Sequence, residues 1–298
     1  MIFVDAKGNL GNQMFEYAFA RMIQEKTGQK ICLNTCFLSK YKPEYKLSLD
    51  DFVLNENVVI DDTNPLPWFV NTYTGIIRIL KGLFPELFFS IMEKFGAYIW
   101  LQEPYKSIKI DERKNYYLVG YWQCTKYFKD IDNIIRSEFN AKYPIKDENK
   151  ELYSTICSKE SVCVTIRRGD YVTNEKYKKE FFQCDEQYFL EGIKRIRKEI
   201  PDIAIVFFSD DIEWVKENIS VDGEVYYESG NDPVWEKLRL MSACKHFVIS
   251  NSTFSWWAQH LSNNPNKIVY APSSWYPDGR KCDIYEPGWR YIDVKGKY

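Results

Sequence analysis

Apolar and polar positions alternate along the chain in two distinct patterns. Residues 2–4 form a short apolar run, a polar loop follows at 5–13, and residues 14–26 then carry apolar side chains at a spacing of three to four. That spacing is typical of an amphipathic helix, and a glycine just beyond it, here Gly28, is a common C-cap. The opening therefore predicts a strand, a glycine loop and a helix, with Asn12 at the helix N-cap.

The second half repeats this plan more regularly. Residues 162–166 are bulky or β-branched, as in a buried strand. Further strands are predicted at 203–208, 225–227, 247–250 and, as the last one, 267–270, and they alternate with helices that begin near 185, after 209–211, at 234 and after 251–253. Strands that alternate with helices predict a doubly wound parallel sheet.

The middle of the chain gives a weaker pattern. Residues 41–114 contain scattered prolines and predict a helix-rich insertion, whereas 116–120 reads as a strand that leads through Tyr121, Trp122 and Gln123 to a short helix at 126–128. Aromatic residues with an amide at a strand end are suited to binding a sugar ring. The alternative is that these aromatic residues only pack as a cluster under a helix. The polar segment 142–150 is the sharpest change in composition, so two domains are predicted, 1–155 and 156–298.

Composition excludes several classes of protein. The 298 residues include 40 basic and 42 acidic side chains, a net charge of −2, so no global field attracts nucleic acid and none is expected as a partner. Eight cysteines form no Cys-x-x-Cys pair and there are only two histidines, so no metal site is predicted. Several cysteines lie in apolar runs, which is typical of buried free thiols in a reducing cytosol.

No run of about eighteen uncharged apolar residues occurs, and no signal peptide is recognised, so we expect a cytoplasmic protein. The most apolar region, 66–101, is interrupted by charged residues. A helical pair docked on the core is one interpretation of this region, and an amphipathic surface that touches lipid is the other.

The first candidate site follows the strand at 162–166, where Arg167, Arg168, Gly169 and Asp170 stand in a row. Ligands of open α/β sheets bind beyond the carboxyl ends of the strands, so two guanidiniums there indicate an anionic ligand, most often a phosphate. The alternative is that both arginines are solvated or form salt bridges with nearby acids.

A second candidate follows the strand at 247–250. Ser250, Asn251, Ser252, Thr253 and Ser255 bring hydroxyl and amide groups to a predicted helix N-terminus, which favours anions. Plain helix capping needs only one or two such residues, so this segment indicates a diphosphate cradle.

The glycine loop at 8–11 raises the possibility of a dinucleotide fold. It lacks the first glycine of G-x-G-x-x-G, and Asn34 stands where an acidic residue would close the next strand. A nicotinamide site is therefore not favoured.

Four segments together resemble the bacterial α-1,2-fucosyltransferases of glycosyltransferase family 11: GNLGNQMF at 8–15, GYWQ at 120–123, TIRRGDY at 165–171 and NSTFSWW at 251–257. The resemblance implies an α/β fold of GT-B type, two Rossmann-like domains that face each other across a cleft. It further implies GDP-β-L-fucose as donor, no metal or other cofactor, inversion at the anomeric carbon, and transfer to the 2-hydroxyl of a galactose-terminated glycan or polysaccharide. Such a galactoside 2-alpha-L-fucosyltransferase is expected in the cytoplasm, with peripheral contact with the inner membrane as an option.

The resemblance also implies roles for individual residues. Arg167 and Arg168 match the arginines that hold the donor phosphates, and Asp170 matches the acid of that motif, either as the general base or as a group that orients Arg168. The donor-binding turn corresponds to Asn251, Ser252, Thr253, Phe254 and Ser255, and the residues that face the cleft from the first domain correspond to Gly11, Asn12, Gln13, Tyr121 and Gln123.

Two positions depart from the family pattern: Thr165 replaces a usual histidine, and Lys237 stands where many members have an acid. These departures put contacts with guanine or ribose in question. Another inverting transferase that uses a different nucleotide sugar, or a non-catalytic sugar- or nucleotide-binding module, stays open as an alternative.

Overall fold

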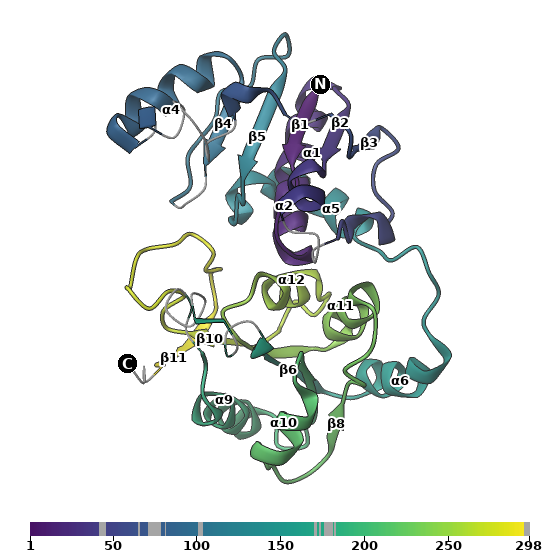
Figure 1. Ribbon diagram of the computed structural model, residues 1–298. Coiled ribbons are helices and arrows are strands. Elements are labelled where there is room, and N and C mark those ends of the chain that lie inside the picture. Colours follow the sequence, from purple (N-terminus) through teal and green to yellow (C-terminus); the bar gives the residue numbers. More distant parts are fainter. Residues whose placement is uncertain are drawn as a thin grey trace. The chain divides into compact units, whose positions relative to one another are not determined.

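A computed structural model describes residues 1–41, 46–64, 66–70, 79–80, 82–100, 104–169, 172, 174–175, 181 and 183–294. The chain divides into two compact units, Met1–Asn140 and Ala141–Tyr298, which are described separately below (Figure 1). The sequence predicted a boundary near residue 155. That position lies within α6 (Lys150–Ser158), a helix of the second unit that contacts α11 (Val234–Ala243).

The first unit contains a five-stranded parallel sheet in the order β3-β2-β1-β5-β4. Its central strands are mostly buried, which explains their apolar sequences. The strands are β1 (Ile2–Asp5), β2 (Ile31–Asn34), β3 (Val58–Asp61), β4 (Ala97–Trp100) and β5 (Tyr116–Gly120). The predicted strands at 2–4 and 116–120 are confirmed.

Helix α1 (Leu10–Thr27) begins earlier than its sequence suggested. Asn9 occupies the N-cap position and Asn12 lies in the first turn, where its N–H donates to the Asn9 carbonyl at 2.9 Å. The assignment of Asn12 as the N-cap is therefore wrong. Gly28 is the C-cap as predicted, with a φ of 67°, a backbone conformation that glycine adopts without strain.

The described residues of the predicted helix-rich insertion, 41–114, contain helices, but they also contain strands that the sequence did not reveal. They supply two strands of the sheet, β3 and β4, in addition to α4 (Pro85–Lys94) and the short 3-10 helices η1 (Leu49–Asp51) and η2 (Trp68–Val70). Helix α4 packs Phe88 and Met92 onto Ala97, Ile99 and Val119. The helix predicted at 126–128 consists of two 3-10 turns, η3 (Thr125–Tyr127) and η4 (Lys129–Ile131), followed by α5 (Asp132–Glu138).

The second unit contains a six-stranded parallel sheet in the order β11-β10-β9-β6-β7-β8, which is the predicted doubly wound arrangement. Its strands are β6 (Ser161–Ile166), β7 (Ala204–Ser209), β8 (Val225–Tyr227), β9 (His246–Ile249), β10 (Val269–Pro272) and β11 (Arg290–Ile292). The strand at the end of the chain was missed, because 267–270 was taken as the last.

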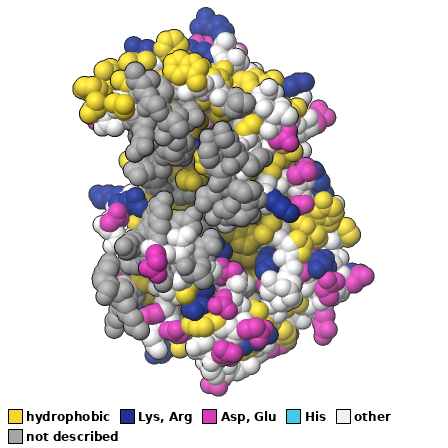
Figure 2. All heavy atoms as spheres, in the orientation of Figure 1, with side chains coloured by type: hydrophobic (Ala, Val, Ile, Leu, Met, Phe, Trp, Pro, Cys, Tyr) yellow, Lys and Arg dark blue, Asp and Glu magenta, His cyan; other side chains and the backbone are white. Residues whose placement is uncertain are grey.

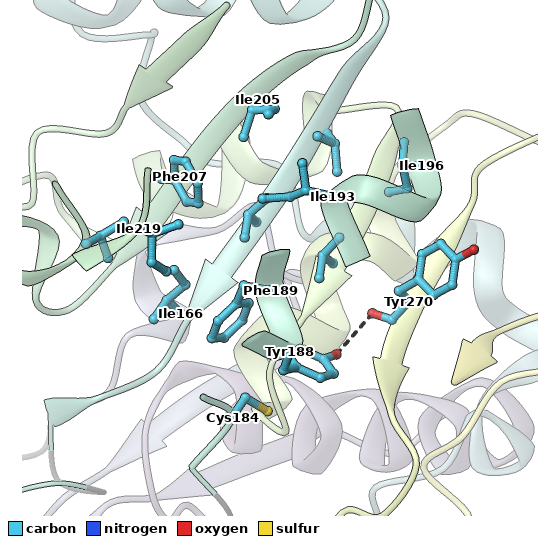
Figure 3. Packing of buried hydrophobic residues seen from close by; sticks show 14 of the residues in the cluster. Ile166, Cys184, Tyr188, Phe189, Ile193, Ile196, Ile205, Phe207, Ile219 and Tyr270 are labelled. Atoms are coloured by element: carbon cyan, nitrogen blue, oxygen red, sulfur yellow. Dashed lines mark hydrogen bonds between the residues drawn. The ribbon is translucent and has the colours of Figure 1, made fainter. Parts of the chain in front are cut away.

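The helices of this unit cover a continuous apolar core (Figure 3). Helix α9 (Glu186–Glu199), which was predicted to begin near 185, buries Tyr188, Phe189, Ile193 and Ile196, and Asp185 caps it by accepting the Tyr188 N–H. The Tyr188 hydroxyl donates to the Ile249 carbonyl at 2.6 Å, which satisfies its polar end inside the core. The remaining helices are α10 (Ile212–Asn218), α11 and α12 (Thr253–Leu261).

Each sheet reverses its winding direction at one point. In the first unit β1 lies between β2 and β5, and in the second β6 lies between β7 and β9. Doubly wound sheets bind ligands beyond the carboxyl ends of the strands at such a point. The candidate residues follow four of the strands at these two points: residues 5–13 follow β1, 121–123 follow β5, 167–170 follow β6 and 250–255 follow β9.

Candidate functional site

Arg167 and Arg168 leave the carboxyl end of β6 and meet two acids from the end of β7. Nη1 of Arg167 lies 2.5 Å from Oδ2 of Asp210, and the Arg168 backbone N–H donates to Oδ1 of the same carboxylate at 2.9 Å. Nε of Arg168 donates to Asp211 at 3.2 Å, and its guanidinium lies 3.5 Å from the ring centroid of Trp214. The two arginines are thus oriented by carboxylates and stacking, as the salt-bridge alternative anticipated.

Although they are paired, both arginines stay partly accessible to solvent at the edge of the sheet. The side chain of Arg167 is 29% exposed and that of Arg168 is 15% exposed. A guanidinium presents five N–H donors in a planar fork, so one edge can bind a carboxylate while another binds a phosphate. Asp170 lies outside the described residues, and its role stays a prediction.

Gly169 allows the backbone to pass directly over Asp210. A Cβ at this position would lie 2.4 Å from Oδ2 of Asp210, closer than side chains tolerate. The glycine after the arginine pair is therefore required by the carboxylate that orients Arg167.

The loop after β9 begins beside the end of β6. The Ser250 N–H points to both the carbonyl and Oγ1 of Thr165, each at 3.3 Å. Ser252 is the N-cap of α12, whose Trp256 N–H donates to the Ser252 carbonyl at 2.9 Å, while the Ser252 side chain makes no capping bond within the described chain. Two of the predicted donor-binding loops therefore leave neighbouring strand ends.

The polar residues of this loop divide into two groups. Asn251 and Ser255 are buried: Nδ2 of Asn251 donates to the Trp275 carbonyl at 3.1 Å, and the Ser255 hydroxyl lies 3.4 Å from that of Ser250. These two side chains hold the loop in shape. Ser252, Thr253 and Phe254 are half-buried at the N-terminus of α12.

In the first unit, Asn12 and Gln123 are in contact although they are 111 residues apart in the sequence. Nε2 of Gln123 donates to Oδ1 of Asn12 at 2.9 Å, and both residues are half-buried at the ends of the neighbouring strands β1 and β5. Tyr121 is also half-buried there. Asn12 and Gln123 are therefore in contact, and the prediction that these residues face a cleft stays a prediction.

Gln13 and Gly11 are positioned differently. Gln13 is fully buried, and its amide donates to the Gly8 and Lys46 carbonyls at 2.9 and 2.8 Å and accepts the Ser48 N–H at 2.9 Å. It therefore fastens the glycine loop to residues 46–48. Gly11 is buried in the first turn of α1.

Trp122 is strained in a way that its sequence did not reveal. Its φ is 53°, unusual for a residue other than glycine, and its ring packs 4.4 Å from Phe19 and 5.5 Å from Tyr127, measured between centroids. The aromatic-cluster alternative therefore describes Trp122. Backbone strain of this kind concentrates at functional sites.

A buried ionic cluster at the end of β1 was also missed. Nζ of Lys7 lies 2.6 Å from Asp5, and the Lys7 backbone N–H donates to Oε2 of Glu16 at 3.1 Å. Burial raises the pKa of the Asp5 carboxyl, and it raises the pKa of Glu16 well above its ordinary value. The signal in the sequence was a lysine two positions after an acid at a strand end, which pattern analysis does not distinguish from a solvated loop.

The described part of the chain contains no group of three His, Cys, Asp or Glu side chains arranged to hold a metal ion. None of the described helices combines the length and apolar character that a membrane span requires.

The two parallel sheets with their helices form an α/β fold of GT-B type. The structure of the α-1,6-fucosyltransferase NodZ co-crystallized with GDP matches this one with a TM-score of 0.58 over 90% of this chain and 94% of that one, at 13% identity. NodZ from Bradyrhizobium, solved separately, matches with a TM-score of 0.56 over 87% and 91% of the two chains, also at 13% identity. At this level of identity the similarity supports the fold.

The chain belongs to glycosyltransferase family 11, whose family model matches residues 1–293. It is 30% identical to an alpha-1,2-colitosyltransferase of Escherichia coli, over 94% of this chain and 93% of the relative. It is 26% identical to the E. coli O-antigen biosynthesis glycosyltransferase WbnK, over 95% and 97% of the two chains. Human galactoside alpha-(1,2)-fucosyltransferase 1 is 22% identical over 94% of this chain and 70% of its own length.

Proposed function

We propose that this glycosyltransferase moves L-fucose from GDP-β-L-fucose to the 2-hydroxyl of a galactose-terminated glycan, with inversion and without a metal ion. The observation that carries the proposal is that Arg167 and Arg168 follow β6 and the N-terminal turn of α12 follows β9, the two neighbouring strands at the reversal point of the second sheet. The α-1,2 linkage is supported by the names of relatives from two donor classes, fucosyl- and colitosyltransferases.

The donor chemistry follows from charge. When the sugar–phosphate bond breaks, negative charge accumulates on the departing diphosphate, and preorganised donors lower the barrier by meeting that charge. Guanidinium groups and the unsatisfied N–H groups of a helix N-terminus are such donors. Asp210 and Asp211 hold the two arginines in orientation before the donor arrives, which lowers the cost of reorganisation during the reaction.

The acceptor chemistry requires in-line attack by a hydroxyl group on the anomeric carbon. We propose that the half-buried Asn12–Gln123 pair and Tyr121 bind the galactoside, because hydrogen-bonded amides and a tyrosine match sugar hydroxyl groups. Asp170 is our candidate for the group that receives the hydroxyl proton or orients Arg168. The pH dependence of turnover by Asp170→Asn distinguishes these roles, because only loss of a base removes the ionisation that limits the rate.

A second candidate function is transfer of colitose, supported by the 30% identity to an alpha-1,2-colitosyltransferase. Incubation with lactose in EDTA, with GDP-fucose and GDP-colitose in separate reactions, distinguishes the two. A fucosylated product supports our proposal, and product from GDP-colitose alone replaces it. Binding of GDP without transfer from either donor indicates a non-catalytic binding module.

Arg167→Ala should lower turnover of GDP-fucose by about 10²-fold or more, because one preorganised donor to the leaving group is lost. Initial rates with lactose, measured with the folded variant in EDTA, test this. Arg195→Ala is the matched control, since Arg195 pairs with Glu191 on an exposed face of α9. A near-normal rate for Arg167→Ala contradicts the assignment of Arg167.

For localisation we propose a cytoplasmic enzyme in weak peripheral contact with the inner membrane. The proposed membrane contact is supported by a stripe of exposed apolar side chains on and next to α4, formed by Phe84, Leu87, Ile91 and Phe95. Figure 2 shows hydrophobic residues gathered at the upper left, where α4 lies in Figure 1.

A further inference from the structure

Trp122 combines two destabilising features at one position. Among the residues that the structure describes, it is the one residue other than glycine with a positive φ, a conformation that is unfavourable for a bulky side chain. The residue is 4% exposed, and its indole N–H has no hydrogen-bond partner within the described chain, which also lowers stability. A conformation that is retained at such a cost points to a role in function.

The left-handed conformation changes the direction of the side chains at the end of β5. In a strand, successive side chains point to opposite faces, so Trp122 and Gln123 would not both reach the same helix if β5 simply continued. Here both of them contact α1. The Trp122 ring lies 4.4 Å from the ring of Phe19, measured between centroids. Nε2 of Gln123 donates to Oδ1 of Asn12 at 2.9 Å.

Asn12 and Phe19 lie on one face of α1, because they are two helical turns apart. Two consecutive residues of the segment after β5 therefore meet one face of the helix. The left-handed residue makes this possible, since it breaks the alternation of the strand. The Cys124 N–H then donates to the Trp122 carbonyl at 2.8 Å, which closes a tight turn around Gln123.

Aromatic packing holds Trp122 in this conformation. Its ring lies 5.5 Å from that of Tyr127, and the rings of Phe19 and Tyr127 are 4.8 Å apart, so the three rings form one cluster. Phe19 is fully buried and Tyr127 is 5% exposed. A ring fixed on two sides leaves the backbone at Trp122 little freedom to return to the extended conformation of a strand.

Asn12 is held from its other side by the glycine loop. A Cβ at Gly8 would lie 2.4 Å from Nδ2 of Asn12, so the loop packs directly on this amide. We infer that Trp122 is a positioning residue for the sugar acceptor, because its packed ring fixes the turn that presents Gln123 beside Asn12. This inference rests on the proposed binding of the galactoside by the Asn12–Gln123 pair.

The test compares the KM for lactose of Trp122→Ala and Trp122→Gly, from initial rates with GDP-fucose in EDTA. Both variants lack the ring, but only glycine adopts a φ of 53° without strain. Trp122→Ala should raise this KM about 5-fold, the effect of one lost hydrogen bond. Trp122→Gly should recover about half of the increase. Packing alone predicts the opposite order, since glycine leaves the larger cavity.

Affinity for GDP separates positioning from stability. Calorimetric titration of the full-length variants should show unchanged GDP affinity, because the GDP contacts are proposed for the second unit. Phe139→Ala and Phe139→Gly are the matched controls. Phe139 is a buried ring of the first unit, 5% exposed, but its φ is −86°, so neither control should change the KM for lactose or favour glycine.

The outcomes separate this inference from the proposed function. If the wild type transfers fucose, the positioning role alone is overturned by an unchanged KM for lactose in Trp122→Ala, or by a KM in Trp122→Gly that is equal or higher. A parallel loss of GDP affinity also overturns it. A wild type that transfers no fucose overturns the proposed function and this inference with it.

A milder variant keeps the test decisive if neither substitution of Trp122 folds. Phe19→Leu removes the ring that packs on Trp122 and keeps most of the buried volume, a change that cores tolerate. It should raise the KM for lactose about 3-fold at unchanged GDP affinity, because the ring of Trp122 is then held on one side only. A KM equal to that of the wild type overturns the inference.

Discussion

At the scale of single residues, the contact between Gly169 and Asp210 makes a sharp prediction. Gly169→Ala would place a Cβ 2.4 Å from the carboxylate that orients Arg167, so that carboxylate must move. Because small displacements of catalytic groups are expensive, kcat for transfer from GDP-fucose should fall about 10-fold or more.

Gly82→Ala provides the matched control, since a Cβ at Gly82 meets no atom within 4 Å. Steady-state kinetics of both variants, after their thermal unfolding has been compared, decide the result. If Gly169→Ala keeps the wild-type kcat, Asp210 does not position Arg167 for the reaction.

The same scale shows what residue patterns could predict. Arg167 and Arg168 were located because two cations directly after a buried strand are distinctive. Asp211 was expected only as a residue just before a helix; it caps α10, and it also binds Arg168. That pair depends on β6 and β7 being neighbours, which a residue pattern does not show. Lys237 was recognised only as a departure from the family pattern, and its ion pair with Glu228, nine positions before it, was not anticipated.

At the scale of elements, the missed strands share one property. β3, β4 and β11 all lie at the edges of their sheets. In β3 and β11 some apolar residues are partly exposed and need not follow the pattern of a buried strand: Val59 and Ile60 of β3 are 45% and 50% exposed. β4 is an edge strand whose described side chains are buried, with Ile99 3% exposed, so exposure does not explain why it was missed. The central strands were predicted because burial on both faces makes their sequences continuously apolar.

Helix α4 has two apolar faces, and the outer one leads to a prediction. Phe88 and Met92 are 7% exposed against the sheet, whereas Phe84, Leu87, Ile91 and Phe95 are 44–70% exposed at intervals of three or four residues. The inner face supports the interpretation of a helix docked on the core, and contact of the outer face with lipid stays a prediction. If the outer stripe inserts among lipid headgroups, the double variant Leu87→Glu, Ile91→Glu should lower co-sedimentation with bilayer vesicles by several-fold.

Because both side chains are already exposed, the double variant should unfold at the wild-type temperature. Val53→Glu is the control, since Val53 is 50% exposed but lies outside the stripe. Equal sedimentation of the wild type and the double variant, or equal loss with the control, contradicts a lipid role for α4.

At the scale of the whole molecule, the number of domains could be predicted and their boundary could not. The polar segment 142–150 has the composition of a linker, yet its side chains bind buried acids. Lys146 contacts Asp232 and Glu236, and Asn149 donates to Glu236 at 3.3 Å. Composition does not distinguish polar groups that are solvated from polar groups that neutralise a buried charge.

This difference predicts how the second unit behaves in isolation. A fragment of residues 141–298 retains Lys146, Asn149 and α6, whereas a fragment of residues 156–298 leaves Glu236, which is fully buried, without two of its donors. Each lost donor to a buried polar group costs about 1–3 kcal/mol, which is a large fraction of the stability of a domain of this size.

The longer fragment should therefore unfold cooperatively on heating, and the shorter one should melt at a clearly lower temperature or without a cooperative transition. Circular dichroism melts of the two fragments measure this directly. Glu236→Gln in the shorter fragment should recover part of the loss, because an amide without donors is less costly to bury than a charge. Equal melting of the two fragments would show that the segment is a linker, as its composition suggests, and that the buried acids are satisfied without it.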